Sequence, residues 1–261
     1  MEVRLDGRVA LITGGSMGMG KAMAEKFAAS GAEVAIVARR PEPLADTARE
    51  IVAAGGRCRH YAGDVSKADE VSRVFNAITA DLGRVDILVN NAGRSQAGNF
   101  EDLTDEIWQG DFDLKVFAAI RFARLAFPAM KSRRWGRIIN VLNIGAKAPG
   151  PGSAPTTVMR AAGMALAKVL AGEGAPFNVL VNCLMTGLIV SDQWARRHRS
   201  VAPQQPFDEF LAEQAKAQRL PMGRFGTAEE FANIACFLAS DAASYVSGTA
   251  INVDGARSPV V

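Results

Sequence analysis

The chain has 261 residues, of which 49% are hydrophobic, 22% charged and 7% aromatic, and its formal net charge is +3. So small a charge argues against a nucleic-acid partner, and the three cysteines show no metal-ligand spacing. No apolar run reaches membrane-spanning length, and the first strand pattern begins at Arg8, too early for a signal peptide to precede it. We therefore expect a cytoplasmic protein that binds no metal, nucleic acid or membrane.

Short apolar runs alternate with helix-length segments along the whole chain. The expected strands are Val9–Thr13, Glu33–Ala38, Arg57–Tyr61, Asp86–Asn90, Gly136–Asn143, Phe177–Leu184 and Thr249–Val253. The expected helices are Gly20–Ala29, Leu44–Ala54, Lys67–Leu82, Thr104–Lys131 and Thr156–Ala171. Several strands are apolar throughout, as strands buried on both faces are. The order predicts one Rossmann-type domain over residues 1–261, an α/β fold with a doubly wound, parallel, seven-stranded sheet and helices on both faces.

One long, charged segment without a strand pattern, residues 187–224, follows the sixth expected strand. In a doubly wound sheet, ligands bind at the carboxyl ends of the strands, where this segment begins. We therefore expect residues 187–224 to form a lid over the substrate.

The first strand runs directly into a glycine-rich turn, which is followed by an amphipathic helix. Glycines let the backbone approach a pyrophosphate closely, and the helix N-terminus offers free N–H groups and a positive dipole end. A glycine-rich turn alone is weak evidence, but its place between strand and helix favours dinucleotide binding. The expected contacts from this turn are Gly14, Ser16, Met17, Gly18, Met19 and Gly20.

Further motifs accompany this turn. They include Asp64-Val65, Asn90-Asn91-Ala92-Gly93, Gly223-Arg224-Phe225-Gly226 and Val253-Asp254-Gly255. With the spacing Thr13-Gly14-x-x-x-Gly18-x-Gly20, they resemble the short-chain dehydrogenase/reductase family over essentially the whole chain. The resemblance implies a nicotinamide dinucleotide cofactor. The cofactor contacts that it implies beyond the turn are Asp64, Val65, Asn91, Ala92, Gly93, Arg160, Ile189 and Ser191.

The end of the second strand indicates which dinucleotide is preferred. An acidic residue there would bind the ribose 2′-hydroxyl of NAD, but this chain has Ala38 followed by Arg39 and Arg40. Two guanidinium groups suit a 2′-phosphate, although Met17 lacks the basic group that many NADP-binding relatives carry. We therefore expect NADP(H) rather than NAD(H).

The resemblance also implies a catalytic set of Asn, Ser, Tyr and Lys, and all four are replaced here. By position, the replacements are Asp113, Asn143, Thr156 and Arg160. The only tyrosines of the chain are residues 61 and 245, so no shift of the alignment supplies the missing one. An aliphatic hydroxyl is a far weaker acid than a tyrosine, and losing a positioned acid costs about 10²–10⁴ in rate.

Two readings of this site stay open. In the first, it is a re-tooled active site of an NAD(P)(H)-dependent oxidoreductase that acts on a small carbonyl or alcohol. In the second, the protein is a catalytically degenerate dinucleotide-binding sensor or partner subunit. Since a buried guanidinium needs a partner, we expect Asp113 and Arg160 to form an ion pair.

Two long expected helices, residues 104–131 and 156–171, are apolar over much of their circumference. One face of a sheet cannot cover so much apolar surface. The corresponding helices form a dimer interface in the family that the chain resembles, and tetramers are common there. We therefore expect a homotetramer.

Overall fold

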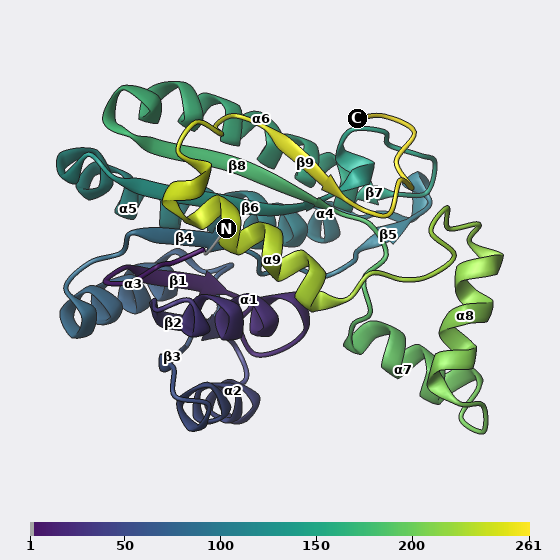
Figure 1. Ribbon diagram of the computed structural model, residues 1–261. Helices are drawn as coiled ribbons and strands as arrows, with labels where there is room; N and C mark the ends of the chain where they lie inside the picture. Colours follow the sequence, from purple (N-terminus) through teal and green to yellow (C-terminus); the bar gives the residue numbers. More distant parts are fainter. Residues whose placement is uncertain (1–2) are drawn as a thin grey trace.

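The computed structural model describes residues 3–261 and is built around a parallel sheet of seven strands (Figure 1). The strand order is β3-β2-β1-β4-β6-β8-β9. The strands are β1 (Val9–Thr13), β2 (Glu33–Ala38), β3 (Arg57–Ala62), β4 (Ile87–Asn90), β6 (Gly136–Asn143), β8 (Val179–Thr186) and β9 (Ala250–Val253). The expected doubly wound Rossmann fold is thus confirmed.

Helices cover both faces of this sheet. The helices are α1 (Gly18–Ala29), α2 (Pro41–Ala53), α3 (Ala68–Leu82), α4 (Asp105–Phe112), α5 (Ala118–Arg133), α6 (Thr156–Gly174), α7 (Asp192–Val201), α8 (Phe207–Ala217) and α9 (Ala228–Ala239). One apolar core lies under α1, α2 and α9, and the other lies under α3, α5 and α6. Strand β1 serves both, because Ala10 and Ile12 face the first core whereas Leu11 faces the second.

Three features of the fold differ from the expectations. The helix expected over residues 104–131 is divided into α4 and α5 by a π-helical turn, Asp113–Phe117. The sixth strand begins at Val179, two residues late, because Asn178 has a left-handed φ of 56° that ends the preceding turn. A short second sheet pairs β5 (Ala97–Gly98) with β7 (Ala154–Pro155) at the carboxyl edge of the main sheet.

Helix α9 was not predicted, although its sequence carries a start signal. Thr227 and Glu230 form a capping box, in which the Thr227 side chain accepts from the backbone of Glu230 and the Glu230 side chain accepts from that of Thr227. The expected lid segment contains α7 and α8, which stand apart from the sheet in Figure 1. No helix in the part of the chain that the structure describes is long and apolar enough to cross a membrane.

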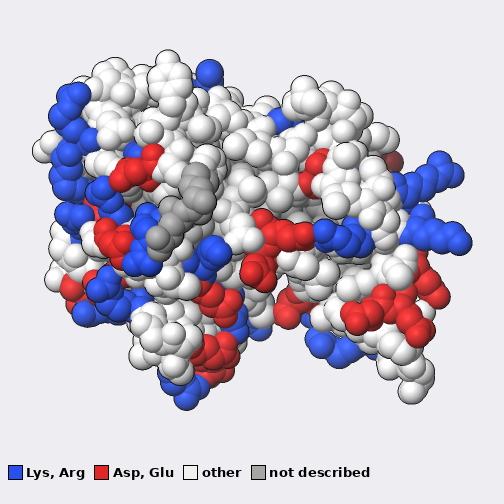
Figure 2. All heavy atoms as spheres, viewed as in Figure 1, with Lys and Arg blue, Asp and Glu red and all other residues white. Residues whose placement is uncertain are grey.

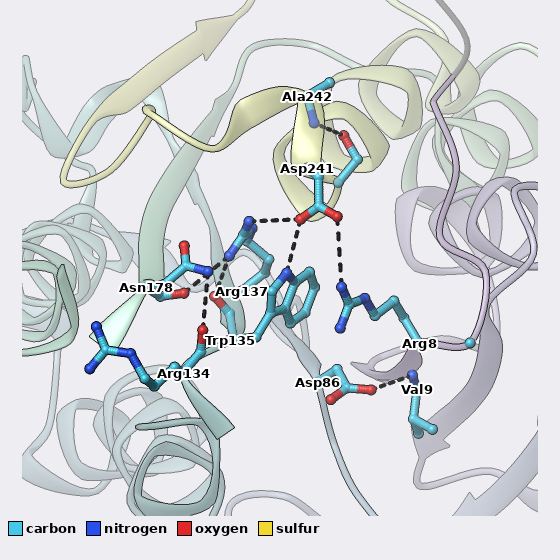
Figure 3. A network of polar contacts seen from close by, with 12 residues as sticks. Arg8, Val9, Asp86, Arg134, Trp135, Arg137, Asn178, Asp241 and Ala242 are labelled. Atoms are coloured by element: carbon cyan, nitrogen blue, oxygen red, sulfur yellow. Dashed lines mark hydrogen bonds and ion pairs between the residues drawn. The ribbon is translucent and has the colours of Figure 1, made fainter. Parts of the chain in front are cut away.

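A polar network joins the strands at their amino ends, on the edge opposite the site described below (Figure 3). The Trp135 ring lies between two guanidinium groups, 3.6 Å from Arg8 and 4.4 Å from Arg137. Asp241, which follows α9, accepts hydrogen bonds from Trp135 Nε1 (2.9 Å) and Arg137 Nη2 (3.3 Å). Burial lowers the pKa of Arg137 to about 10. The network therefore links the starts of β1 and β6 to the end of α9, at the edge of the sheet opposite the glycine-rich turn.

Candidate active site

A cleft of about 960 Å³ runs along the carboxyl ends of the parallel strands. In the space-filling view, the molecule is indented between the body that carries α1 and α2 and the part formed by α7 and α8 (Figure 2). Every residue expected to contact the dinucleotide lines this cleft, and so do Asn143 and Thr156. Of the expected site residues, only Asp113 lies outside the lining.

The glycine turn is held against β4 by Thr13 and Asn91. Thr13 Oγ1 accepts hydrogen bonds from the backbone N–H groups of Asn91 and Ala92, both at 3.0 Å. Asn91 Nδ2 donates in return to the backbone oxygens of Thr13 (2.9 Å) and Gly14 (3.2 Å). These bonds fix the turn between β1 and α1 before any ligand arrives.

The space beside this turn fits a pyrophosphate. Gly14 has a φ of +68°, and a Cβ on Gly20 would lie 2.1 Å from the Gly14 oxygen. The first turn of α1 has no side-chain cap, because the N-cap residue Met17 makes no such bond. Free N–H groups and the positive end of the helix dipole are therefore available to an anion there.

The far end of the cleft carries the charges expected around an adenosine ribose. Arg40 Nη2 lies 3.0 Å from Met17 Sδ, so a guanidinium covers the turn that lacks a basic residue of its own. Partial burial opposes ionisation of Asp64, but hydrogen bonds from Ser66 and the charge of Arg39 outweigh it and lower its pKa. Asp64 is thus held as a carboxylate beside Arg39.

The hydroxyl of Thr156 has no hydrogen-bonding capacity left over. It accepts from Gln96 N and from Lys115 Nζ, both at 2.9 Å, and it donates to Gln96 O at 2.8 Å. A hydroxyl offers one proton and two lone pairs, so these three bonds saturate it. Any substrate oxygen that binds Thr156 must replace one of these partners.

Behind Thr156 lies a buried ion pair that the sequence analysis missed. Lys115 Nζ lies 2.5 Å and 2.6 Å from the two carboxylate oxygens of Asp111. The side chains of Lys115 and Asp111 are 4% and 0% exposed. Burial lowers the pKa of Lys115 to about 8; Asp111 opposes this shift, whereas the charges of Arg160 and Arg94 add to it. The four-residue spacing of the pair was a readable helical signal.

The expected ion pair between Asp113 and Arg160 is wrong. Asp113 instead accepts from Gln109 Nε2 (3.0 Å) and Arg121 Nη2 (3.3 Å). Residues two apart in a helical segment point to nearly opposite sides, so Asp113 faces away from the surface that carries Lys115. Arg121 also donates to Ser66 O (2.7 Å), which makes Asp113 a support for the Asp64 loop.

Arg160 and Asn143 keep polar atoms available. Arg160 Nη1 donates to Val141 O (2.8 Å), while its buried Nε has no partner. Among residues 3–261, no carboxylate lies within 4.0 Å of its guanidinium. Burial lowers the pKa of Arg160 to about 10, and the nearby charge of Asp111 opposes that shift. The buried Asn143 Oδ1 also lacks a partner.

Comparisons with known proteins agree with this geometry. A family model described as enoyl-(acyl carrier protein) reductase matches residues 14–256. L-Sorbose reductase from Gluconobacter frateurii, solved with NADPH and L-sorbose, is 36% identical, with a TM-score of 0.94 and 100% of each chain covered. An NADPH-bound short chain oxidoreductase from Pseudomonas aeruginosa PAO1, described as containing an atypical catalytic center, is 34% identical, with a TM-score of 0.92 and 99% of each chain covered.

A curated relative points the same way. The 3-oxoacyl-(acyl-carrier-protein) reductase FabG of Aquifex aeolicus is 32% identical over 256 residues, which cover 98% of this chain and 99% of the relative. The chain belongs to the short-chain dehydrogenase/reductase family of NAD(P)-dependent oxidoreductases.

Proposed function

We propose that the protein is an NADP(H)-dependent reductase of a small carbonyl compound, with an active site that uses neither tyrosine nor the usual lysine. The observation that carries the proposal is one continuous cleft, which is lined by the glycine-rich turn at one place and by Thr156, Arg160 and Asn143 at another. The preference for NADP(H) is supported by Arg39 and Arg40 at one end of that cleft. It is also supported by the NADPH bound to two similar structures.

The chain's own residues orient the reactants. A bound nicotinamide supplies the hydride. Arg160, held by Val141 O, presents a planar cation that can hydrogen-bond ribose hydroxyls, as its fork geometry allows. Asn143 is the last residue of β6 and lines the cleft, and its side chain can hydrogen-bond a substrate hydroxyl or carbonyl.

We further propose that residues 187–224, within a single domain of residues 1–261, close over the substrate. The segment is attached by a narrow link, in which Val190 N donates to Gly226 O (2.9 Å) and Gly226 N donates to Leu188 O (3.0 Å). Trp194 lines the cleft and packs edge-on against Phe225, with 4.7 Å between ring centroids. Such a link can act as a hinge, so that residues 187–224 move toward the rest of the domain and close the cleft.

We also propose that the protein is a homotetramer. Helix α6 exposes Val158 (49%) and Val169 (57%), eleven residues apart on one face of the helix. Exposed apolar side chains on a long helix favour burial against a second copy.

Binding and turnover measurements test the reductase proposal. NADPH and NADP⁺ are titrated by fluorescence, and turnover is then followed at 340 nm over a panel of small ketones, aldehydes and polyols. We expect NADPH to bind and at least one carbonyl to be reduced. Binding without turnover across the panel would instead support a non-catalytic dinucleotide sensor, which the saturated Thr156 hydroxyl favours.

A further inference from the structure

The Asp111–Lys115 pair lies outside the cleft proposed to bind the dinucleotide, because neither residue lines it. Its position is nevertheless specific: Lys115 Nζ reaches through the wall of the cleft to Thr156 Oγ1, which does line it. Burying two charges is costly, and an apolar pair of similar size would often serve stability equally well. A buried cation hydrogen-bonded to a cleft hydroxyl is therefore placed for a chemical task.

We propose that Lys115 supplies the proton for carbonyl reduction and that the Thr156 hydroxyl relays it to the substrate oxygen. The inference rests on the reductase function proposed above and identifies the residues that replace tyrosine in it. Lys115 is the proton source and Thr156 the contact with substrate. Asp111 is a positioning residue that holds the ammonium group against Thr156.

Thr156 can turn its proton toward a substrate without leaving a protein group unpaired. Its hydroxyl donates to Gln96 O, but that same oxygen also accepts from the backbone N–H of Thr156 at 3.3 Å. A developing alkoxide is a stronger acceptor than a peptide oxygen, because charge-assisted hydrogen bonds are about twice as strong as neutral ones. The hydroxyl is therefore expected to turn into the cleft when negative charge forms there.

The proton and electron balance closes without an additional reagent. Hydride from NADPH forms the new C–H bond, while the carbonyl π electrons move to oxygen. That oxygen takes the Thr156 Oγ1 proton, and Oγ1 takes a proton from Lys115 Nζ as the N–H bond breaks. The products are the alcohol, NADP⁺ and a neutral Lys115, which solvent reprotonates through Thr156 once the product leaves.

The charges around Lys115 set the pH range of the relay. Asp111 of α4 holds the ammonium form, whereas burial, Arg160 of α6 and Arg94 of the loop after β4 all make it a stronger acid. The resulting pKa of about 8 lies close to neutral pH, where a general acid is most effective. Since the protonated form is the donor, reduction is expected to slow as the pH rises through about 8.

The charged residues at the other two replaced positions, Arg160 and Asp113, are poorer proton sources. Arg160 has a pKa of about 10 and binds a backbone oxygen, and Asp113 faces the opposite side of its helix. Thr156 on its own cannot act, because an aliphatic hydroxyl ionises far above neutral pH. Of these groups, Lys115 combines a suitable pKa with a hydrogen bond to the cleft wall.

The test uses steady-state kinetics of the full-length protein with NADPH and the carbonyl substrate found in the panel. For Lys115→Met we expect kcat to fall about 10²–10³-fold with the Kd of NADPH within about threefold of wild type. Because this change leaves the Asp111 carboxylate unpaired, the double variant Asp111→Leu/Lys115→Met, which removes both charges, is measured beside it. Lys168→Met, on the exposed side of α6, is the matched control.

Two changes at Thr156 separate relay from packing. Thr156→Ser keeps the hydroxyl, and kcat should stay within about fivefold, whereas Thr156→Val keeps the shape and should lose about 10²-fold. The fall in kcat above pH 8 should be present in the wild type and in Thr156→Ser, and absent in the double variant, a difference that a merely structural role would not produce.

Three results would overturn the relay. The first is a double variant that folds, binds NADPH and retains both its rate and its fall above pH 8. The second is equal activity of Thr156→Val and Thr156→Ser. The third is a wild-type protein that binds NADPH but reduces no carbonyl, which would overturn the reductase function as well, whereas the first two leave that function standing.

Discussion

The charges around the cleft predict most directly that the protein prefers NADPH to NADH. Arg39 and Arg40 are both exposed at its outer end, and Ala38 precedes them where an acidic residue would bind the ribose of NAD. Replacing both arginines by alanine should therefore weaken the binding of NADPH and leave that of NADH almost unchanged, because only NADPH carries the 2′-phosphate.

The expected loss of NADPH affinity follows from the exposure of the two arginine side chains to solvent. A hydrogen bond to a charged group contributes about 1.5–3 kcal/mol, and solvent screening places these two guanidinium groups at the low end. Each then contributes about 1.4 kcal/mol, a tenfold change in Kd. As neighbours that share one phosphate, they are not fully additive, so the double variant should weaken NADPH binding roughly 30- to 100-fold.

Fluorescence titration with NADPH and NADH measures both constants. Arg49→Ala, on the outer surface of α2, removes one guanidinium group away from the cleft, as each single replacement does at the cleft, and should leave both constants unaltered. Raising the salt concentration should shrink the preference for NADPH in the wild type, since exposed charges are screened. Equal weakening of NADPH and NADH by the double variant would refute the assignment of the two arginines to the 2′-phosphate.

Three further predictions concern the glycine-rich turn, the contact between Asp241 and Arg137, and the proposed homotetramer. Gly20→Ala places a methyl group about 2.1 Å from a backbone oxygen and should abolish measurable NADPH binding in the same titration, whereas Gly172→Ala, which meets open space, should not. Asp241→Ala removes a carboxylate partner of the buried Arg137 and should lower the free energy of unfolding by ~1–3 kcal/mol in chemical denaturation, with NADPH affinity intact. Val169→Glu puts a charge on the exposed face of α6; if the wild type is the proposed tetramer, light scattering should report a smaller particle for this variant, and an unchanged mass would contradict the proposed interface.

The local pattern of the sequence was enough to predict the architecture. Buried parallel strands are continuously apolar, and β1, β2 and β6 were predicted with their observed boundaries. Glycines mark backbone that other residues rarely adopt, and Gly31, Gly55 and Gly83, which lie just after three of the expected helices, all have positive φ. The residues expected around the dinucleotide line one cleft because the carboxyl ends of parallel strands meet at one edge.

What the tertiary structure decided is which side chains meet. The sequence contains Asp113 and Arg160 as complementary charges, but Asp113 points away from the side of the helix that carries Lys115 and pairs with Arg121 instead. The pairing of β5 with β7 brings Gln96 to Thr156, and the packing of α6 beside the π-helical turn Asp113–Phe117 brings Lys115 to the same hydroxyl. Thr156 and Lys115 are 41 residues apart in the chain, so no local pattern records their contact.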